Sequence, residues 1–136
     1  MIIMAVDLGK ARTGIAASDK TEYLASPVKV ISEHNRERLL TTVADTAREI
    51  KAELVVVGLP KNMDGSEGES AKNAREFAHL LSEELSLEVK LWDERCTTIT
   101  AHGYLNDTNT RGKKRKAVID EVAATVILQS FLDSRR

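Results

Sequence analysis

The sequence predicts an α/β fold in which helices flank a five-stranded mixed sheet. Short apolar runs separated by turns fill the first quarter of the chain, which is typical of strands. Apolar residues at helical spacing then alternate with two further short apolar runs, which is typical of parallel crossovers. Three antiparallel strands are therefore expected first, followed by two strands joined through right-handed crossovers.

The first three strands are expected within residues 2–31. Residues 2–8 are nearly all apolar and predict a buried strand. The turn over residues 9–12 is so short that residues 13–18 must return antiparallel, as a hairpin. Residues 23–31 predict a third strand, and Pro27 favours the sheet edge for it because proline donates no ladder hydrogen bond.

Two helices and two strands follow. Apolar residues three and four apart predict a helix on each side of the strand at residues 54–57, and the strand at residues 89–92 comes after the second helix. The helix-forming residues are Leu39, Leu40, Val43, Ala44, Ala47 and Ile50, and then Ala74, Phe77, Ala78, Leu81 and Leu85. Ser70 is expected to cap the second helix.

The last part of the chain combines short polar segments with one long apolar helix. Thr97 and Thr98 are candidate caps for a short helix over residues 99–105. Residues 106–116 predict a polar, basic loop, and residues 117–132 predict the final helix. Five of the six residues from Arg111 to Lys116 are Lys or Arg, which indicates either phosphate contact or simply a solvated loop.

Composition is consistent with a single cytoplasmic domain over residues 1–136. The formal net charge is −1, so nucleic-acid contact would require a local basic patch. The single Cys96 excludes an intramolecular disulfide and suits a reducing compartment. The sequence contains no apolar stretch of about 18 residues, so no membrane partner is expected.

Acidic residues stand at the ends of three predicted elements. Asp7 ends the first strand, the pair Asp93 and Glu94 follows the fifth, and Asp120 lies in the first turn of the last predicted helix, where the apolar C-terminal segment begins. Parallel crossovers bring such positions to one sheet edge, where several carboxylates can bind Mg²⁺ or Mn²⁺. Strand alternation lets only one of Asp93 and Glu94 face the site, and the longer Glu94 is favoured.

Each acid also has a structural interpretation. Asp7 could cap its turn, and the Asp93–Glu94 pair could be a solvated acidic turn. Asp120 could interact with the helix dipole, although Ala123, Ala124 and Ile127 give it an apolar face on which a charge needs a partner. The glycine-bearing loop at residues 61–69 is interpreted as a substrate-side loop or a plain turn, and its spacing does not match a P-loop.

Taken together, these segments resemble the YqgF family, whose members are described as Holliday junction resolvases and as pre-16S rRNA processing nucleases. The matching motifs span nearly the whole chain in the family's order, and only Cys96 and Thr100 depart from the common pattern. The motifs are Asp7-Leu8-Gly9, Arg12-Thr13-Gly14, Ser18-Asp19, residues 58–68, Asp93-Glu94-Arg95-Cys96-Thr97-Thr98, Lys113-Lys114, Asp120 and Ala123-Ala124.

The resemblance implies a ribonuclease H-like fold and phosphodiester hydrolysis with two divalent ions, Mg²⁺ or Mn²⁺. Asp7, Glu94 and Asp120 would be the catalytic metal ligands. Basic residues would hold the nucleic acid, namely Arg95, Arg111, Lys113, Lys114, Arg115 and Lys116. The partner would be precursor rRNA, with an association with the ribosome, or branched DNA.

Several functions fit these residues. A resolvase of four-way junctions is expected to be a symmetric homodimer, whereas an rRNA nuclease could be a monomer. A nucleotide-binding domain of the actin–Hsp70 type also carries an Asp-x-Gly turn, but it needs two such domains, and this chain has the length of one. A non-catalytic RNA-binding assembly factor would need the basic residues but not the acids.

Overall fold

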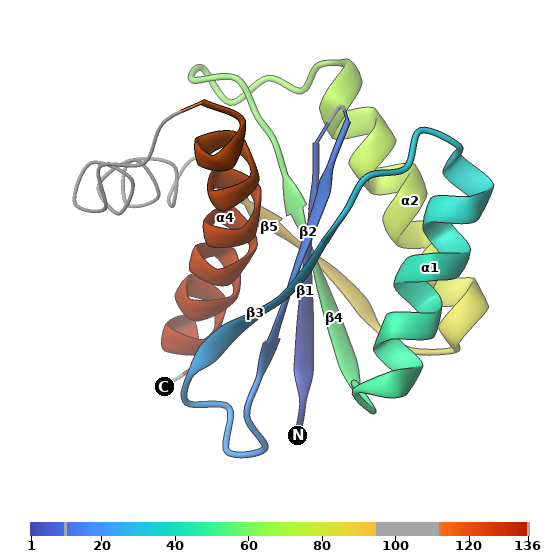
Figure 1. The fold of residues 1–136 in the computed structure, drawn as a ribbon, viewed down its shortest axis with the longest axis vertical. Coiled ribbons are helices and arrows are strands. Elements are labelled where there is room, and N and C mark those ends of the chain that lie inside the picture. Colours follow the sequence, from blue (N-terminus) through green and yellow to red (C-terminus); the bar gives the residue numbers. More distant parts are fainter. Residues whose placement is uncertain (10, 95–111, 136) are drawn as a thin grey trace.

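A five-stranded sheet forms the centre of the protein, with helices on both faces (Figure 1). The computed structural model describes residues 1–9, 11–94 and 112–135, and in the last of these ranges it describes side chains from residue 122 onward. The strand order is β3-β2-β1-β4-β5. This mixed sheet confirms the fold class that the sequence predicts.

The strands joined by short turns pair antiparallel, and the strands joined through helices pair parallel. β1 (Ile3–Leu8) and β2 (Thr13–Ser18) form an antiparallel hairpin, and β3 (Ala25–Ile31) extends it as an edge strand. β4 (Leu54–Leu59) and β5 (Val89–Asp93) lie parallel to β1 on its other side. The carboxyl ends of β1, β4 and β5 therefore point toward one edge of the sheet.

Helices α1 (Arg36–Glu49) and α2 (Glu69–Leu85) cover one face of the sheet. The Asn35 side chain caps α1 by accepting a hydrogen bond of 3.0 Å from the backbone N–H of Arg38. The expected Ser70 cap on α2 is wrong, because α2 begins at Glu69 after an extended Gly68. The preceding loop closes between Asn62 and Ser66, so the chain enters the helix earlier than expected.

The last helix, α4 (Gly112–Ser134), covers the opposite face and begins five residues earlier than predicted. The expected loop is therefore wrong for residues 112–116, which form the first turns of α4. Lys and Arg are among the strongest helix formers, and repulsion between like charges in a helix costs only tenths of a kcal/mol. The short helix predicted over residues 99–105 lies outside the described part of the chain.

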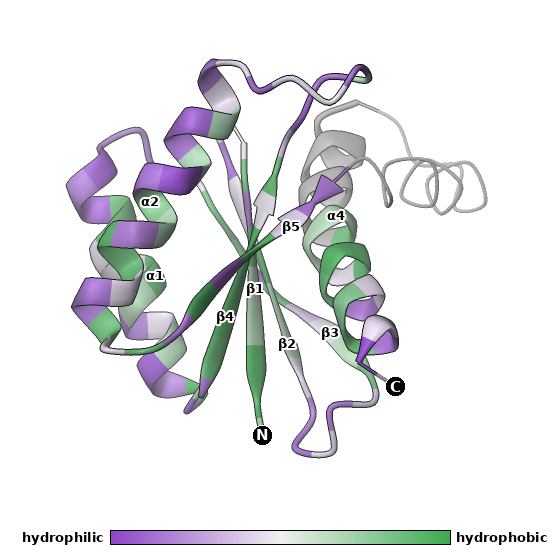
Figure 2. Ribbon diagram, turned by 180° about the vertical axis from the view of Figure 1, so that it is seen from behind, coloured by the Kyte–Doolittle hydropathy of each residue, from purple (hydrophilic) through white to green (hydrophobic). Residues whose placement is uncertain are grey.

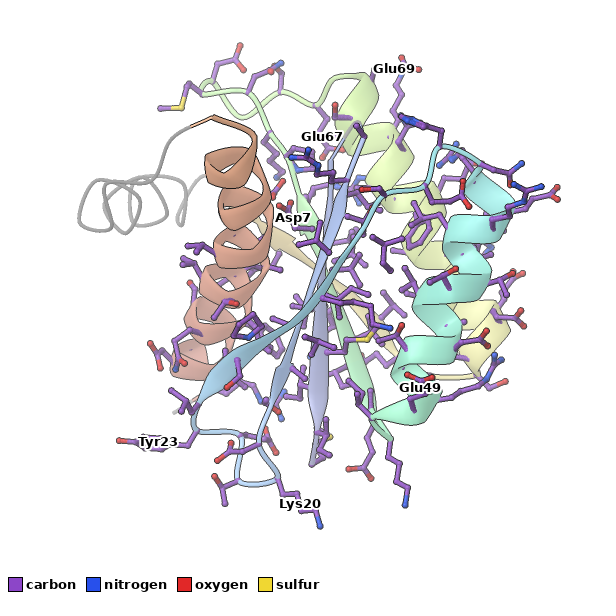
Figure 3. All side chains as sticks on the ribbon, in the orientation of Figure 1. Asp7, Lys20, Tyr23, Glu49, Glu67 and Glu69 are labelled. Carbon is purple, nitrogen blue, oxygen red and sulfur yellow. The ribbon has the colours of Figure 1, made fainter. Side chains whose placement is uncertain are left out.

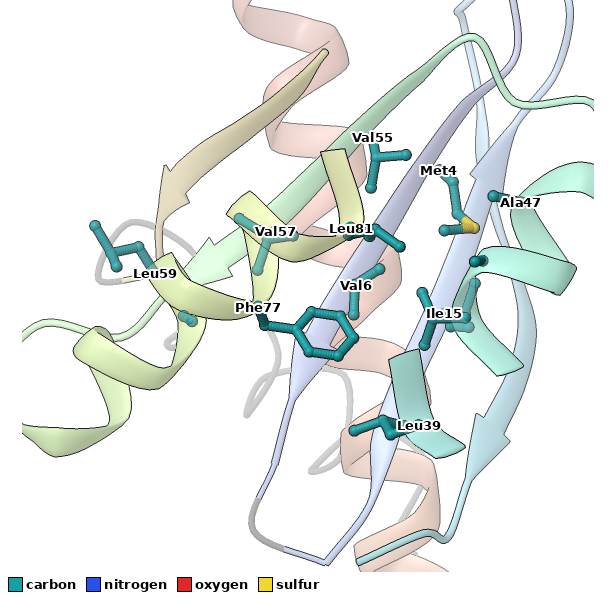
Figure 4. Close-up of a cluster of buried hydrophobic side chains, with 14 of the residues drawn as sticks. Met4, Val6, Ile15, Leu39, Ala47, Val55, Val57, Leu59, Phe77 and Leu81 are labelled. Atoms are coloured by element: carbon teal, nitrogen blue, oxygen red, sulfur yellow. The ribbon is translucent and has the colours of Figure 1, made fainter. Parts of the chain in front are cut away.

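Alternating strand residues divide the core into two layers. Met4 and Val6 pack with α1 and α2 in the cluster drawn in Figure 4. Ile3 and Ala5 point the other way, into a second cluster that includes Ile127 of α4. Figure 2 shows the consequence, with hydrophobic colours along the central strands and hydrophilic colours on the outer surfaces of α1 and α2. None of the described helices is long and apolar enough to cross a bilayer.

Candidate active site

The carboxyl groups of Asp7 and Glu94 lie on the sheet face that α4 covers. Ile3 and Ala5 pack in the α4-side cluster, so Asp7, which follows Ala5 by two residues, faces the same way. Trp92 packs against that cluster as well, and Glu94 follows it by two residues. Figure 3 shows Asp7 between the sheet and α4. Two acids separated by 87 positions in the sequence are thereby brought together.

Asp7 and Glu94 share a hydrogen bond between their carboxyl groups. Two carboxylates cannot bond to each other without a proton, so one of the two groups is protonated. Glu94 is the donor, because the contact lowers the pKa of Asp7 and raises that of Glu94. The pair therefore carries one negative charge rather than two.

Burial is the largest cause of the altered pKa values. It raises the pKa of Asp7, and the hydrogen bond from Glu94 offsets part of that increase. Burial also raises the pKa of Glu94 to about 9, with further contributions from the Asp7 hydrogen bond and from the charges of Asp7 and Asp93. Glu94, rather than Asp93, is thus the acid that contacts Asp7, and Asp93 adds negative charge nearby.

Asp120 lies in the third turn of α4, well inside the helix. The helix dipole acts mainly on the first and last turns, so the observed helix start removes the interpretation of Asp120 as an N-terminal dipole acid. Position 120 belongs to the same helical stripe as Ala124 and Ile127, which are buried against the sheet. The Asp120 side chain lies outside the described part of the chain.

The donor set suits a hard divalent cation. Two partly buried carboxyl groups with a single shared proton form a site in which a cation can replace the proton and neutralise both charges. Among the described residues no group of three or more metal-ligating side chains occurs, and the side chain of Asp120, the third expected ligand, lies outside them. The chemistry of these carboxyl groups is therefore suited to binding a divalent ion.

Arg12 adds an unexpected cation to the same end of the sheet. Gly9 donates a backbone hydrogen bond of 2.8 Å to the carbonyl of Arg12, and any Cβ at Gly9 would overlap that carbonyl. The Nη1 atom of Arg12 is buried and has no hydrogen-bond partner within the part of the chain that is described. The sequence places Arg12 in a turn and in the motif Arg12-Thr13-Gly14 but gives it no predicted role, although a charge shortly after the strand of Asp7 is an available signal.

The loop after β4 is held by its own polar groups. Asn62 and Ser66 are joined by a backbone bond and a side-chain bond of 2.9 Å each, and Asp64 accepts from the Ser66 hydroxyl at 2.6 Å. Glu67 forms two bonds of 2.7 Å to Arg75 on α2. Figure 3 shows Glu67 at the same end of the molecule as Asp7. Its role as a substrate-side loop stays a prediction.

The predicted nucleic-acid contacts are only partly located. Lys113, Lys114, Arg115 and Lys116 belong to the first turns of α4, and their side chains are not described. Arg95 and Arg111 lie outside the described residues altogether. Figure 1 shows that α4 begins at the end of the sheet to which β1, β4 and β5 run. The backbone therefore places the basic stretch on the side of the acid pair.

A groove between β3 and α4 is the main alternative location for a site. Its lining contains no titratable side chain, so it lacks groups for acid–base or metal chemistry. The lining residues are Leu24, Ala25, Pro27, Val122, Thr125, Val126 and Gln129. The acid pair, which lies outside this groove, is the better candidate.

Comparison with known proteins identifies sequence relatives along the full length. A family model described as "RuvX: Holliday junction resolvase" matches residues 1–134. A protein of Clostridium beijerinckii named "Putative pre-16S rRNA nuclease" is 39% identical, covering 98% of this chain and 96% of its own length. A protein of Geobacillus sp. with the same name is 42% identical and covers 100% of both chains.

Solved structures share the fold at low sequence identity. RuvC of Thermus thermophilus in complex with a Holliday junction substrate superposes with a TM-score of 0.65 at 13% identity, covering 99% of this chain and 95% of RuvC. The fowlpox virus Holliday junction resolvase gives a TM-score of 0.57 at 16% identity, covering 98% of this chain and 99% of its own. These similarities confirm the expected ribonuclease H-like fold.

Without metal, the free energy of unfolding is expected to fall as the pH rises from about 5 to about 9. The unfolded chain releases the Glu94 proton near the ordinary pKa of 4.5, whereas the folded chain keeps it up to a pKa of about 9. The folded state binds the extra proton in this window, so raising the pH destabilises it. Urea unfolding in chelator should show a loss of about 3 kcal/mol between pH ~6 and ~8.5.

Glu94→Gln is the matched control, since it keeps the shape of the side chain and removes its titration. Its unfolding free energy should depend less on pH than that of the wild type over the same range. Parallel pH curves for the two proteins would show that the buried pair does not hold the proton.

Proposed function

The chain belongs to the RuvX family, and from that membership we propose that it is a divalent-metal-dependent endonuclease. Asp7, Glu94 and Asp120 would be its catalytic metal ligands, with Mg²⁺ or Mn²⁺ as the ion and two ions per site. The proposed substrate is the precursor of 16S rRNA, which would place the activity in the cytoplasm and in association with ribosome assembly.

One observation carries the proposal, namely the partly buried pair of carboxyl groups that Asp7 and Glu94 form. Two carboxyl groups held together where solvation is poor can be charged at the same time only at a cost in stability, so the arrangement needs a reason beyond folding. A cation that binds both groups supplies such a reason. The pair lies at the carboxyl ends of parallel strands, where α/β sheets commonly bind ligands.

Each part of the chain would have a distinct task. Asp7, Glu94 and Asp120 would hold the divalent ions, which would supply activation of a water molecule and stabilisation of the departing oxygen of the phosphodiester. The basic start of α4 would bind phosphate oxygens of the substrate. Arg12, whose buried Nη1 has no hydrogen-bond partner among the described residues, would bind them as well.

Branched DNA is the second candidate substrate. The family description and the fold shared with RuvC favour it, whereas the names of the curated relatives favour precursor rRNA. A resolvase matches the symmetry of a four-way junction by acting as a homodimer. A protein that is strictly monomeric at working concentration would therefore favour the rRNA substrate.

Cleavage of precursor 16S rRNA is expected with Mn²⁺ or Mg²⁺ and is expected to stop when a chelator is added. Asp7→Asn should lower the cleavage rate by at least about a hundredfold, because the neutral amide lacks the negative charge and the second oxygen with which a carboxylate binds divalent ions. A gel assay with precursor rRNA and a synthetic four-way DNA junction, run side by side, measures both substrates.

Asp45→Asn is a suitable control for that assay. Asp45 is an exposed acid on α1, paired only with the exposed Arg48 among the residues described. Its replacement should leave cleavage unchanged. Binding of either nucleic acid without cleavage in any metal would contradict the proposal and support the non-catalytic assembly factor.

Metal binding should stabilise the fold independently of catalysis. At pH ~8, Mn²⁺ at a hundred times its dissociation constant is expected to stabilise the wild type by about 2.7 kcal/mol. Asp7→Asn should lose most of this effect, while Asp45→Asn should keep it. Thermal unfolding with and without Mn²⁺ is the measurement, and equal shifts for all three proteins would exclude Asp7 as a ligand.

The basic start of α4 is expected to control the salt dependence of nucleic-acid binding. Replacing both Lys113 and Lys114 by Gln should reduce the slope of log affinity against log salt by about 1.4 to 1.8, since each phosphate contact contributes about 0.7 to 0.9. Lys20→Gln, at the opposite end of the molecule in Figure 3, should leave the slope unchanged. An unaltered slope in the double variant would show that these lysines stay in solvent.

A further inference from the structure

We propose that Gly58 is the positioning residue that allows the carboxyl groups of Asp7 and Glu94 to meet across β4. Gly58 has no side chain and contributes no chemical group to catalysis. Its contribution is the space left by a missing side chain, at the point where the two acids must reach over an intervening strand.

The strand register shows why space is needed there. In the parallel pair of β1 and β4, Val6 lies beside Val57, so Asp7 and Gly58 are next in line. On the other side of β4, Gly58 lies beside Trp92. Adjacent strands are about 4.8 Å apart, so the backbones of β1 and β5 are separated by roughly 10 Å. The side chains of Asp7 and Glu94 must therefore bridge the width of β4.

Gly58 also lies on the face where this bridge forms. Leu54 and Val56 of β4 pack in the α4-side cluster, and Gly58 continues that alternation. Any side chain at position 58 would project toward α4, into the space between the two acids. A residue on the other face, such as Val57, would not enter that space.

The contacts around Gly58 show that this space is filled by Glu94 and α4. An ideal Cβ at position 58 would lie 3.0 Å from both Cγ and Cδ of Glu94 and 2.8 Å from Cδ1 of Ile127. These distances are too short for ordinary carbon contacts, for which about 3.5–4.0 Å is optimal. The Glu94 side chain thus crosses directly over the Gly58 backbone on its way to Asp7.

Backbone strain does not explain the glycine. The positive-φ residues identified along the described backbone include Gly65, whereas Gly58 is an ordinary strand residue of β4. Alanine could adopt this backbone without a conformational penalty. An alanine side chain would, however, displace at least one of its two neighbours, Ile127 and Glu94. Ile127 can withdraw the end of its flexible side chain. Glu94 would have to shift by a few tenths of an ångström, which moves the end of the side chain that contacts Asp7.

Close packing of α4 is the competing explanation, because Ile127 is the nearest neighbour of the added Cβ. Ile127→Val separates the two effects, since valine lacks the Cδ1 atom that would collide. The double variant Gly58→Ala/Ile127→Val relieves the contact with α4 and retains the contact with Glu94. Its behaviour therefore distinguishes loss of packing from displacement of the acid.

The first test requires no metal. Crystal structures of the wild type, Gly58→Ala and the double variant should show the carboxyl groups of Asp7 and Glu94 in hydrogen-bond contact only in the wild type. If the contact persists in either variant, the inference is wrong. Should Gly58→Ala fail to fold, the double variant, with its collision relieved, provides the same comparison.

The second test measures Mn²⁺ affinity by calorimetry and rests on the proposed function. Gly58→Ala should weaken Mn²⁺ binding by about tenfold or more, as expected for residues that orient metal ligands. Ile127→Val alone should bind as the wild type does. In the double variant the melting temperature should recover toward that of Ile127→Val while the affinity stays low. Recovery of the affinity as well would assign the role of Gly58 to packing and overturn the inference.

Failure of the proposed function and failure of the inference about Gly58 would give different results in these two tests. If the wild type binds no Mn²⁺, the proposed function is wrong, but the crystal structures still decide whether Gly58 positions Glu94. If the wild type binds Mn²⁺ and Asp7→Asn does not, while Gly58→Ala binds normally, the proposed function stands and the inference about Gly58 fails.

Discussion

The contact between Asp7 and Glu94 is the interaction on which the rest of the site depends. Burial alone disfavours the charged form of each acid, and proximity makes a second charge still less favourable. The metal-free protein meets this constraint by retaining a proton between the two groups. The same low solvation would strengthen the attraction between these groups and a divalent ion. The arrangement that makes two charges costly would therefore also favour a bound divalent cation.

The sheet topology makes the pair possible, because β1, β4 and β5 run parallel and end at one edge. The antiparallel β1–β2 hairpin brings Arg12 to that same edge, and the loop after β4 closes on itself nearby. Helix α4 crosses the face on which the acids meet and packs there through Ile127. Position 120 lies about two turns before Ile127, so the packing of α4 also determines where a third acid stands.

Much of this could be predicted from sequence, because the signals are local. Apolar runs and helical periodicity gave the order of the elements, and crossover handedness gave the shared strand edge. The start of α4 was missed because a run of like charges favours a loop in sequence, whereas the helix propensity of Lys and Arg prevails in the structure. The Ser70 cap was missed because the loop from Asn62 to Ser66 closes through contacts that sequence does not display.

The roles of Arg12 and Gly58 could not be predicted for a different reason. Each depends on what surrounds it in three dimensions. Arg12 has a buried Nη1 atom with no partner among the described residues, and Gly58 is a strand position crossed by another residue's side chain. A glycine next to Leu59 and Pro60 resembles a plain strand ending, and only the register with β1 and β5 shows that it separates two acids. The site is thus defined as much by an absent side chain as by the carboxylates. This means that changes at position 58 should act on the geometry of the acids before they act on the fold.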